Sequence, residues 1–316
     1  MLETEIRRRL DSLTKPPGSL GRLEELALRA GLIQQRSMPE IRSKAMLIFC
    51  ANHGVAEEGV SAYPPEVTRQ MMANFHAGGA AINVLCRHFG IEPIIVDIGV
   101  DNPTRNFARE PAMTRDEVLE AMEIGRGYAK SSFDILGAGE MGIANTTAAA
   151  ALLCAFTGLD PAEAAGRGTG LDDAGMERKI LAIRRAMALH RPDPSDALGV
   201  LAALSGREIA AIAGLILGAA EQRKIVMLDG FISCSAALVV QAMQPGALDC
   251  VLFAHCSAEQ GHQKMLEALA ARPLLDLGMR LGEGTGAAFG IALVEASVRL
   301  YREMATFAGA GVSSAQ

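Results

Sequence analysis

The sequence predicts an α/β protein with a doubly wound parallel sheet and a second, smaller helical domain. Short apolar or β-branched segments alternate with longer helical patterns along most of the chain, and several of these segments are almost continuously apolar. Such segments are typical of parallel strands that helices cover on both faces. Residues 1–40 lack them and predict helices only. With 316 residues, 50% of them hydrophobic and 21% charged, the chain can bury a large core.

The predicted strands and helices alternate in chain order. Strands are expected at Ala45–Ala51, Ile94–Ile98, Phe133–Leu136, Lys224–Leu228 and Cys250–Ala254, and helices at Glu66–His76, Arg115–Ala129, Ser257–Ala270 and Gly286–Met304. Ligands bind at the carboxyl ends of the strands of such sheets. Polar or Gly-rich turns follow several strand ends, such as Asn52-His53-Gly54, Asp229-Gly230 and His255-Cys256-Ser257. This arrangement is typical of an enzyme.

The two ends of the chain are expected to pack together as the smaller domain. Residues 1–40 predict two helices separated by the Pro- and Gly-rich segment TKPPGSLG. We therefore expect residues 1–40 and 284–316 to form a small helical domain, and residues 41–283 a large α/β, Rossmann-like catalytic domain.

Charge and hydropathy exclude several classes of function. The net charge is 30 − 36 = −6 with no long basic run, which argues against nucleic acid as a partner. The longest apolar runs, Ile209–Ala220 and Phe231–Met243, are shorter than the ~20 residues of a membrane-spanning helix, so no membrane partner is expected. The amphipathic start and the absence of C-x-x-C pairs lead us to expect a cytoplasmic protein with reduced thiols.

The segment GAGEMG (residues 137–142) matches the G-x-G-x-x-G pattern of dinucleotide-binding turns. This interpretation is disfavoured because Glu140 would lie where a pyrophosphate approaches. A more general one is a helix N-terminus at Gly142, Ile143 and Asn145 that binds phosphate or carboxylate, with the hydroxyl of Thr146 nearby. Alternatively, the glycines only permit tight packing of a strand on a helix.

A second Gly-rich segment spans residues 166–175 and precedes Lys179. The pair Asp172-Asp173 invites comparison with magnesium-dependent enzymes of phosphoribosyl pyrophosphate, but Gly-Thr-Gly stands where those enzymes have a hydrophobic strand. Helix N-capping is the favoured role for the pair. Lys179 is the better ligand candidate.

Glu283 lies between two glycines, in a position where a ligand can approach its carboxylate closely. Apolar surroundings would raise its pKa toward that of a general base, whereas the alternative is an ordinary acid near the start of the last helix. A metal site at His53, His255 and His262 is disfavoured because no H-x-x-x-H occurs, and no G-x-S-x-G marks a serine nucleophile.

Taken together, several segments in this order resemble one known family from about Leu13 to Leu300. They are TKPPGSLGRLE, NHGVAEEGVSAYPPEVT, GAGEMGIANTT, GRGTGLDD, GREIAAIAG, LDGFISCSAAL, AHCSAEQGH and LGEGTGAA. The family is that of the nicotinate-nucleotide:dimethylbenzimidazole phosphoribosyltransferases of cobalamin lower-ligand assembly. The resemblance implies a homodimer that transfers phosphoribose from nicotinate mononucleotide to 5,6-dimethylbenzimidazole, giving α-ribazole 5′-phosphate and nicotinate.

The resemblance also implies roles for individual residues. Glu283 matches the family's general base, and inversion at the anomeric carbon follows from attack opposite nicotinate. The expected substrate-binding residues are Glu140, Gly142, Ile143, Asn145, Thr146, Lys179 and Asp229, with Ser61, Tyr63, Gln70 and Leu281 at the base pocket. No metal and no cofactor is expected, because the leaving group is nicotinate and not pyrophosphate.

Three alternatives stay open at this point. The acceptor could be adenine, another benzimidazole or a phenol. The chain could be a non-catalytic nucleotide-binding homologue, although a retained Glu283 argues against this. A nicotinamide-dependent oxidoreductase is the third alternative. The preference of the donor site for nicotinate or its amide is also left open.

Overall fold

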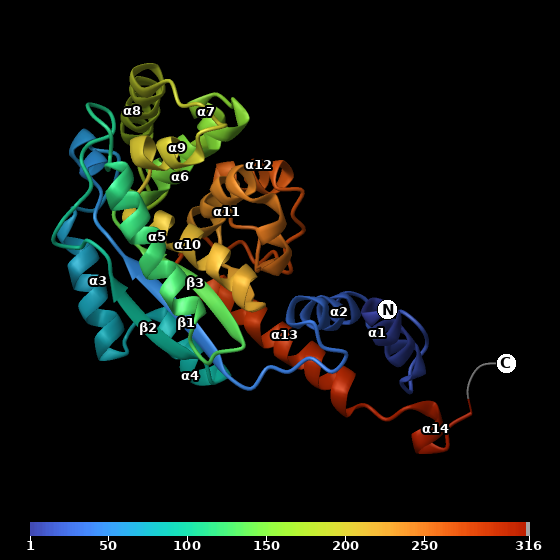
Figure 1. Ribbon diagram of the computed structural model, residues 1–316. Coiled ribbons are helices and arrows are strands. Elements are labelled where there is room, and N and C mark those ends of the chain that lie inside the picture. Colours follow the sequence, from blue (N-terminus) through green and yellow to red (C-terminus); the bar gives the residue numbers. More distant parts are fainter. Residues whose placement is uncertain (314–316) are drawn as a thin grey trace.

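One parallel sheet organises the computed structural model, which describes residues 1–313 (Figure 1). Within these residues the sheet has five strands in the order β2-β1-β3-β4-β5. The strands are β1 (Lys44–Cys50), β2 (Glu92–Asp97), β3 (Ile135–Met141), β4 (Ile225–Leu228) and β5 (Val251–Phe253). All neighbouring pairs are parallel, and the predicted doubly wound α/β fold is confirmed.

The helices cover both faces of the sheet. They are α1 (Leu2–Ser12), α2 (Arg22–Gln34), α3 (Glu66–Ala77), α4 (Ala81–Phe89), α5 (Arg115–Ala129), α6 (Asn145–Thr157), α7 (Pro161–Ala164), α8 (Asp173–His190), α9 (Ala197–Leu204), α10 (Arg207–Gln222), α11 (Phe231–Met243), α12 (Gln260–Ala268), α13 (Thr285–Glu303) and α14 (Phe307–Ala310), with 3₁₀ helices η1 (Gly54–Glu58) and η2 (Pro245–Cys250).

Alternate side chains of β1 enter two different hydrophobic cores. Leu47 and Phe49 pack in the larger core, which includes residues of α5, α6, α9, α10 and α11. Met46 and Ile48 pack in the second core, with residues of α2, α4 and α13. Because successive strand residues point to opposite faces, a strand buried on both sides has to be apolar throughout. The continuous apolar runs of the sequence have this cause.

The strand predicted at Phe133–Leu136 was placed wrongly at both ends. Strand β3 runs from Ile135 to Met141, so the Gly-rich segment expected as a turn is mostly strand. A Cβ at Gly137 would overlap the side chain of Met46, and a Cβ at Gly139 would overlap the backbone of Glu283. These glycines therefore serve close packing. The helix predicted at Ser257–Ala270 is also shorter and corresponds to α12.

The two ends of the chain lie together at one side of the molecule (Figure 1). Ile6, Leu10 and Leu28 of α1 and α2 form a third apolar cluster with Tyr301 of α13. Arg9 donates to the carbonyl oxygens of Tyr301 and Arg302. The first half of α13 instead packs on the sheet. The division into two domains stays a prediction, and residues 314–316 of its small domain lie outside the described residues.

Two acids cap helices, and one of them, Asp172, was predicted to do so. Asp160 accepts from the backbone N–H of Ala162 at the start of α7, and Asp172 accepts from that of Gly175 at the start of α8. In the part of the chain that the structure describes, no helix has both the length and the apolar character required to cross a bilayer.

Candidate active site

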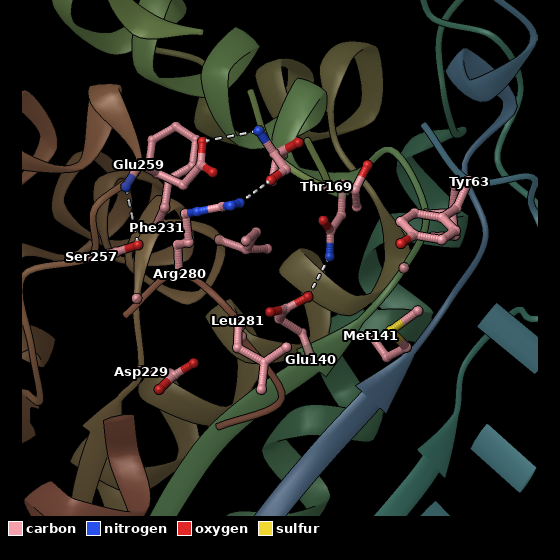
Figure 2. A pocket seen from close by; sticks show the side chains of 18 of the residues that line it. Tyr63, Glu140, Met141, Thr169, Asp229, Phe231, Ser257, Glu259, Arg280 and Leu281 are labelled. Carbon is pink, nitrogen blue, oxygen red and sulfur yellow. Dashed lines mark hydrogen bonds between the residues drawn. The ribbon is translucent and has the colours of Figure 1, made fainter. Parts of the chain in front are cut away.

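A pocket of about 290 Å³ lies at the carboxyl ends of β3, β4 and β5 (Figure 2). Strand β2 lies on one side of β1, whereas β3, β4 and β5 follow one another on its other side. The connections therefore diverge between β1 and β3. Clefts that bind ligands form where the connections diverge in this way. The lining side chains include Tyr63, Glu140, Met141, Asn145, Thr146, Thr169, Asp229, Phe231, His255, Ser257, Glu259, Arg280 and Leu281.

Glu140 brings a buried carboxyl group to the floor of the pocket, at the end of β3 (Figure 2). Its Oε2 accepts a hydrogen bond from the side-chain amide of Asn145. Burial raises the pKa of Glu140 to about 8, and the nearby carboxylates of Asp229, Glu208 and Glu283 act in the same direction. Glu140 therefore holds a proton near neutral pH when the pocket is empty.

The turn from β3 into α6 supplies the next part of the pocket. Gly142, Ile143, Asn145 and Thr146, which the sequence analysis singled out as substrate-binding residues, all line it. The backbone N–H groups of Ile143 and Asn145, however, are not free. They donate to the Thr68 hydroxyl at 3.0 Å and to the Gly142 carbonyl at 3.1 Å. The expected row of free amides is thus shorter than predicted.

Lys179 lies behind this turn with a fully buried side chain. Its Nζ donates to the Thr146 hydroxyl and to the Gly166 carbonyl, each at 2.9 Å. Burial lowers the pKa of Lys179 to about 8, and the carboxylate of Glu259 opposes this shift. Lys179 is not a lining residue in the empty pocket, but it holds the hydroxyl of one that is.

Glu283 belongs to a turn that crosses the end of β3. Gly282, Glu283 and Gly284 all have positive φ, of 83°, 64° and 93°. The carboxylate of Glu283 is buried and accepts from the backbone N–H of Ile82 at 3.3 Å. Burial raises the pKa of Glu283, and Asp229 adds to this rise. Gly282 lines the pocket, whereas Glu283 is not one of the lining residues.

The residues predicted for the base pocket are only partly brought together. Tyr63 and Leu281 line the pocket and are 54% and 59% exposed. Ser61 is near its edge, with its hydroxyl 3.2 Å from that of Thr169. Gln70 is exposed on α3 and is not a lining residue. In Figure 2, Tyr63 and Met141 stand on one side of the pocket and Asp229, Ser257 and Phe231 on the other.

Sequence reasoning missed several lining residues, of which Arg280 matters most. Within the described residues it is the one Lys or Arg side chain that lines the pocket. Its guanidinium donates to the Gly168 carbonyl at 2.9 Å and extends over the pocket (Figure 2). Its place in the segment RLGEGTG, three residues before Glu283, was the available signal.

His53, His255 and His262 each lie beside a partner within the protein. His53 Nε2 lies 2.8 Å from Glu208 Oε1 in a fully buried pair, and His262 Nδ1 accepts from the backbone N–H of Ser257. His255 Nε2 lies 3.8 Å from Asp229. In residues 1–313, no group of three or more His, Cys, Asp or Glu side chains is arranged to hold a metal ion.

The pocket therefore combines groups suited to two tasks. The carboxylate of Glu283, whose pKa burial raises, suits proton acceptance, whereas Glu140 already holds a proton near neutral pH. Arg280, with the hydroxyl of Thr146 and the ammonium of Lys179 behind it, suits an anionic ligand.

Comparisons with known proteins agree over nearly the whole chain. A family model described as "Phosphoribosyltransferase" matches residues 1–312. Proteins named nicotinate-nucleotide–dimethylbenzimidazole phosphoribosyltransferase are similar. That of Chloroflexus aggregans is 51% identical over 98% of this chain and 93% of its own, and that of Geobacter sp. (strain M21) is 47% identical over 99% and 95%. A crystal structure of CobT from Thermus thermophilus matches with a TM-score of 0.94 and 44% identity, covering 99% of each chain.

Proposed function

Since the chain belongs to this phosphoribosyltransferase family, we propose that it moves phosphoribose from nicotinate mononucleotide to 5,6-dimethylbenzimidazole, a step of cobalamin biosynthesis. The products are α-ribazole 5′-phosphate and nicotinate. The single observation that carries the proposal is 51% identity to a relative of that name over 98% of the chain. The pocket supports it, because carboxyl groups with raised pKa values lie beside cationic groups at the carboxyl ends of the strands.

Glu283 is the general base of the proposed reaction. Its carboxylate takes the N–H proton of the benzimidazole, while the lone pair of the other ring nitrogen forms a bond to the anomeric carbon. The bond from that carbon to nicotinate breaks, and its electron pair passes to the pyridinium nitrogen. Attack on the face opposite nicotinate inverts β to α. Burial and the charge of Asp229 support this role, because both raise the pKa of Glu283.

The phosphate and carboxylate of the donor are negatively charged, and they match the cations Arg280 and Lys179 at the pocket. We assign its phosphoribosyl part to Glu140, the Gly142–Thr146 turn and Lys179, and an anionic group of the donor to Arg280 as well. Because the leaving nicotinate is already a pyridinium, it departs without protonation by a general acid. Because the leaving group is not pyrophosphate, we predict turnover without added metal.

The acceptor occupies the side of the pocket near Ser61, Tyr63, Gln70 and Leu281. Adenine, another benzimidazole or a phenol is the alternative acceptor, and these exposed residues do not separate the candidates. We also propose a cytoplasmic homodimer, which rests on the family resemblance. Light scattering on the purified protein should then give twice the chain mass of 33.3 kDa.

A product assay tests the proposal. Purified protein is mixed with nicotinate mononucleotide and 5,6-dimethylbenzimidazole without metal, and products are followed by chromatography and NMR. An α-configured riboside phosphate plus nicotinate is expected. If a product formed only with adenine or a phenol, that base would replace 5,6-dimethylbenzimidazole as the proposed acceptor. If no base gave a product, the result would favour a non-catalytic binding protein.

The matched variant is Glu283→Gln, which keeps the shape of the side chain and removes the base. Turnover should fall about 100-fold or more, the usual scale for a general base, with donor binding largely kept. A rate close to that of the wild type would reject Glu283 as the base.

A further inference from the structure

The carboxylate of Asp229 is bonded to the backbone at the start of α13. Asp229 follows β4 directly and is buried. Its Oδ1 accepts from the N–H of Ala287 at 2.9 Å, and its Oδ2 accepts from the N–H of Gly284 at 3.3 Å. Both oxygens are thus occupied by the segment that directly follows Glu283. The sequence led us to expect a substrate ligand here, and Asp229 does line the pocket, but both of its carboxylate oxygens accept from the backbone.

The turn that Asp229 holds needs such support. Gly282, Glu283 and Gly284 follow one another with positive φ, and the middle one is not a glycine. A left-handed residue that carries a Cβ is strained and persists only where its surroundings impose that conformation. The start of α13 has no cap of its own, because its N-cap residue is Gly284 and no side chain of the turn bonds there. Asp229 supplies the missing cap from another element.

Other contacts restrict the same turn from different sides. A Cβ at Gly139 of β3 would overlap the carbonyl group of Glu283, so the turn lies directly on the strand. The hydroxyl of Thr285 donates to the Gly282 carbonyl at 2.9 Å. A Cβ at Gly286 would overlap the ring of His255. The backbone of Glu283 is therefore clamped between β3 and the end of β4.

We infer that Asp229 is a positioning residue: its bonds to Gly284 and Ala287 fix the turn that aims Glu283 at the acceptor. The inference rests on the proposed role of Glu283 as the base. It assigns Asp229 no contact with substrate. Aim matters because misplacement of a reacting group by about 1 Å can cost 100-fold in rate.

Asp229 also sets the electrostatic surroundings of the base. Its charge adds to the raised pKa of Glu283 and, together with Glu208 and Glu283, to that of Glu140. His255 faces Asp229 from the end of β5, 3.8 Å away, and the Ile82 N–H faces Glu283 from α4. Burial raises the pKa of Asp229 itself, whereas His255 and the backbone N–H groups at the start of α13 favour its ionised form. Removal of the ionised carboxylate should lower the pKa of Glu283, a change that loss of packing alone would not produce.

The test compares Asp229→Asn with the wild-type enzyme in steady-state turnover over a range of pH. We expect kcat to fall about 100-fold, with the KM of each substrate changed less than about threefold, because aim is lost and binding is kept. The acid limb of the kcat profile should move to lower pH. Asp196→Asn is the control, since Asp196 caps α9 through the Gly199 N–H far from the pocket. Its kcat should be unchanged.

Asp229→Asn is also combined with Glu283→Gln. If Asp229 acts through Glu283, it should cause no further loss in the double variant. Additive losses, or a wild-type kcat and pH profile in Asp229→Asn, would overturn the inference. A wild-type rate in Glu283→Gln would instead reject the proposed base, so the two failures are distinguishable. Should Asp229→Asn not fold, Thr285→Val loosens the same turn, and a wild-type kcat there would count against the inference.

Discussion

Four buried acids, Glu140, Glu208, Asp229 and Glu283, determine the electrostatics beneath the pocket. All are less than a tenth exposed, and the charges of the other three raise the pKa of Glu140. Acids packed this closely cannot all ionise without a nearby cation. Arg280 lines the pocket, and Lys179 bonds to the Thr146 hydroxyl behind it. A donor with a pyridinium ring would add a further positive charge.

Replacing Glu140 should change how stability depends on pH. Its pKa rises from 4.5 in the unfolded chain to about 8 in the folded one. Between these values the unfolded chain releases a proton that the folded protein keeps, so this residue favours unfolding increasingly as pH rises. Glu140→Gln should therefore gain stability relative to the wild type between about pH 5 and pH 8 in urea unfolding. Glu123→Gln, at an exposed position, should show no such trend. The prediction would be contradicted if the free energy of unfolding of Glu140→Gln differed from that of the wild type by the same amount at every pH.

Replacing Lys179 should weaken donor binding. Its ammonium is the charge held behind the Thr146 hydroxyl, where the proposed phosphate lies. Methionine matches its length and tolerates burial but cannot donate. We expect the KM for nicotinate mononucleotide to rise about 10- to 100-fold in Lys179→Met, the scale of a lost charged hydrogen bond. Lys264→Met, on the surface of α12, is the control. An unchanged KM in Lys179→Met would show that Lys179 does not contribute to donor binding.

Among the elements, α6 and α13 meet the pocket in the same way. Each follows an acid, Glu140 or Glu283, and each begins after a left-handed residue, Ala144 or Gly284, without a side-chain cap from its own turn. The similar segments LGAGEMGIANTT and LGEGTGAA thus place two helix N-termini at one site. The positive ends of these helices partly compensate the acids and favour anionic ligands.

The crossing of α5 and α10 depends on glycine for close backbone approach. A Cβ at Gly125 would overlap the carbonyl oxygen of Ala211, and one at Gly214 would overlap that of Met122. Each glycine lies against the backbone of the other helix. Helix propensity favours alanine at either position, so packing and propensity oppose one another here.

Two alanine substitutions in α5 separate these effects. Gly125→Ala should destabilise the protein by about 1–3 kcal/mol, because the added methyl group overpacks the crossing. Gly127→Ala, two residues further along, meets nothing within 4 Å and should stabilise by up to about 1 kcal/mol. Thermal and urea unfolding measure both. If both variants changed the free energy of unfolding in the same direction, the account of the crossing would be contradicted.

Across the whole molecule, the six cysteines are free and differ in access. Five are buried, and Cys256 is partly exposed. Burial raises the pKa of Cys50, Cys86, Cys154 and Cys250 to about 12, so their thiolates are scarce near neutral pH. With a thiol reagent, the folded protein should react at Cys256 only, and the denatured protein at all six. Rapid reaction of several thiols in the folded state would show that the core opens.

The parts of the site that could be predicted from the sequence are those that depend on residues next to one another in the chain. Glycines beside Glu283, the Gly142–Thr146 turn after a strand, and Asp172 before a helix are patterns of neighbouring residues, and the structure places each at a turn or helix start. The extent of β3 was not predictable, because Gly137 and Gly139 look like turn residues until Met46 and Glu283 lie against them. Arg280 was missed although it stands in the segment RLGEGTG, because the Gly168 carbonyl that it bonds lies 112 residues away in the chain.

The sequence by itself determined the fold class, the approximate strands and helices, and the family resemblance, because apolar periodicity and the order of motifs depend only on the order of residues in the chain. Only the tertiary structure decided which distant groups meet. Asp229 bonds to Gly284 across 55 residues, and His53 pairs with Glu208 across 155. The physical reason is that a carboxylate's partner depends on which strand ends lie side by side. That arrangement is set by the packing of the whole sheet and not by neighbours in the chain.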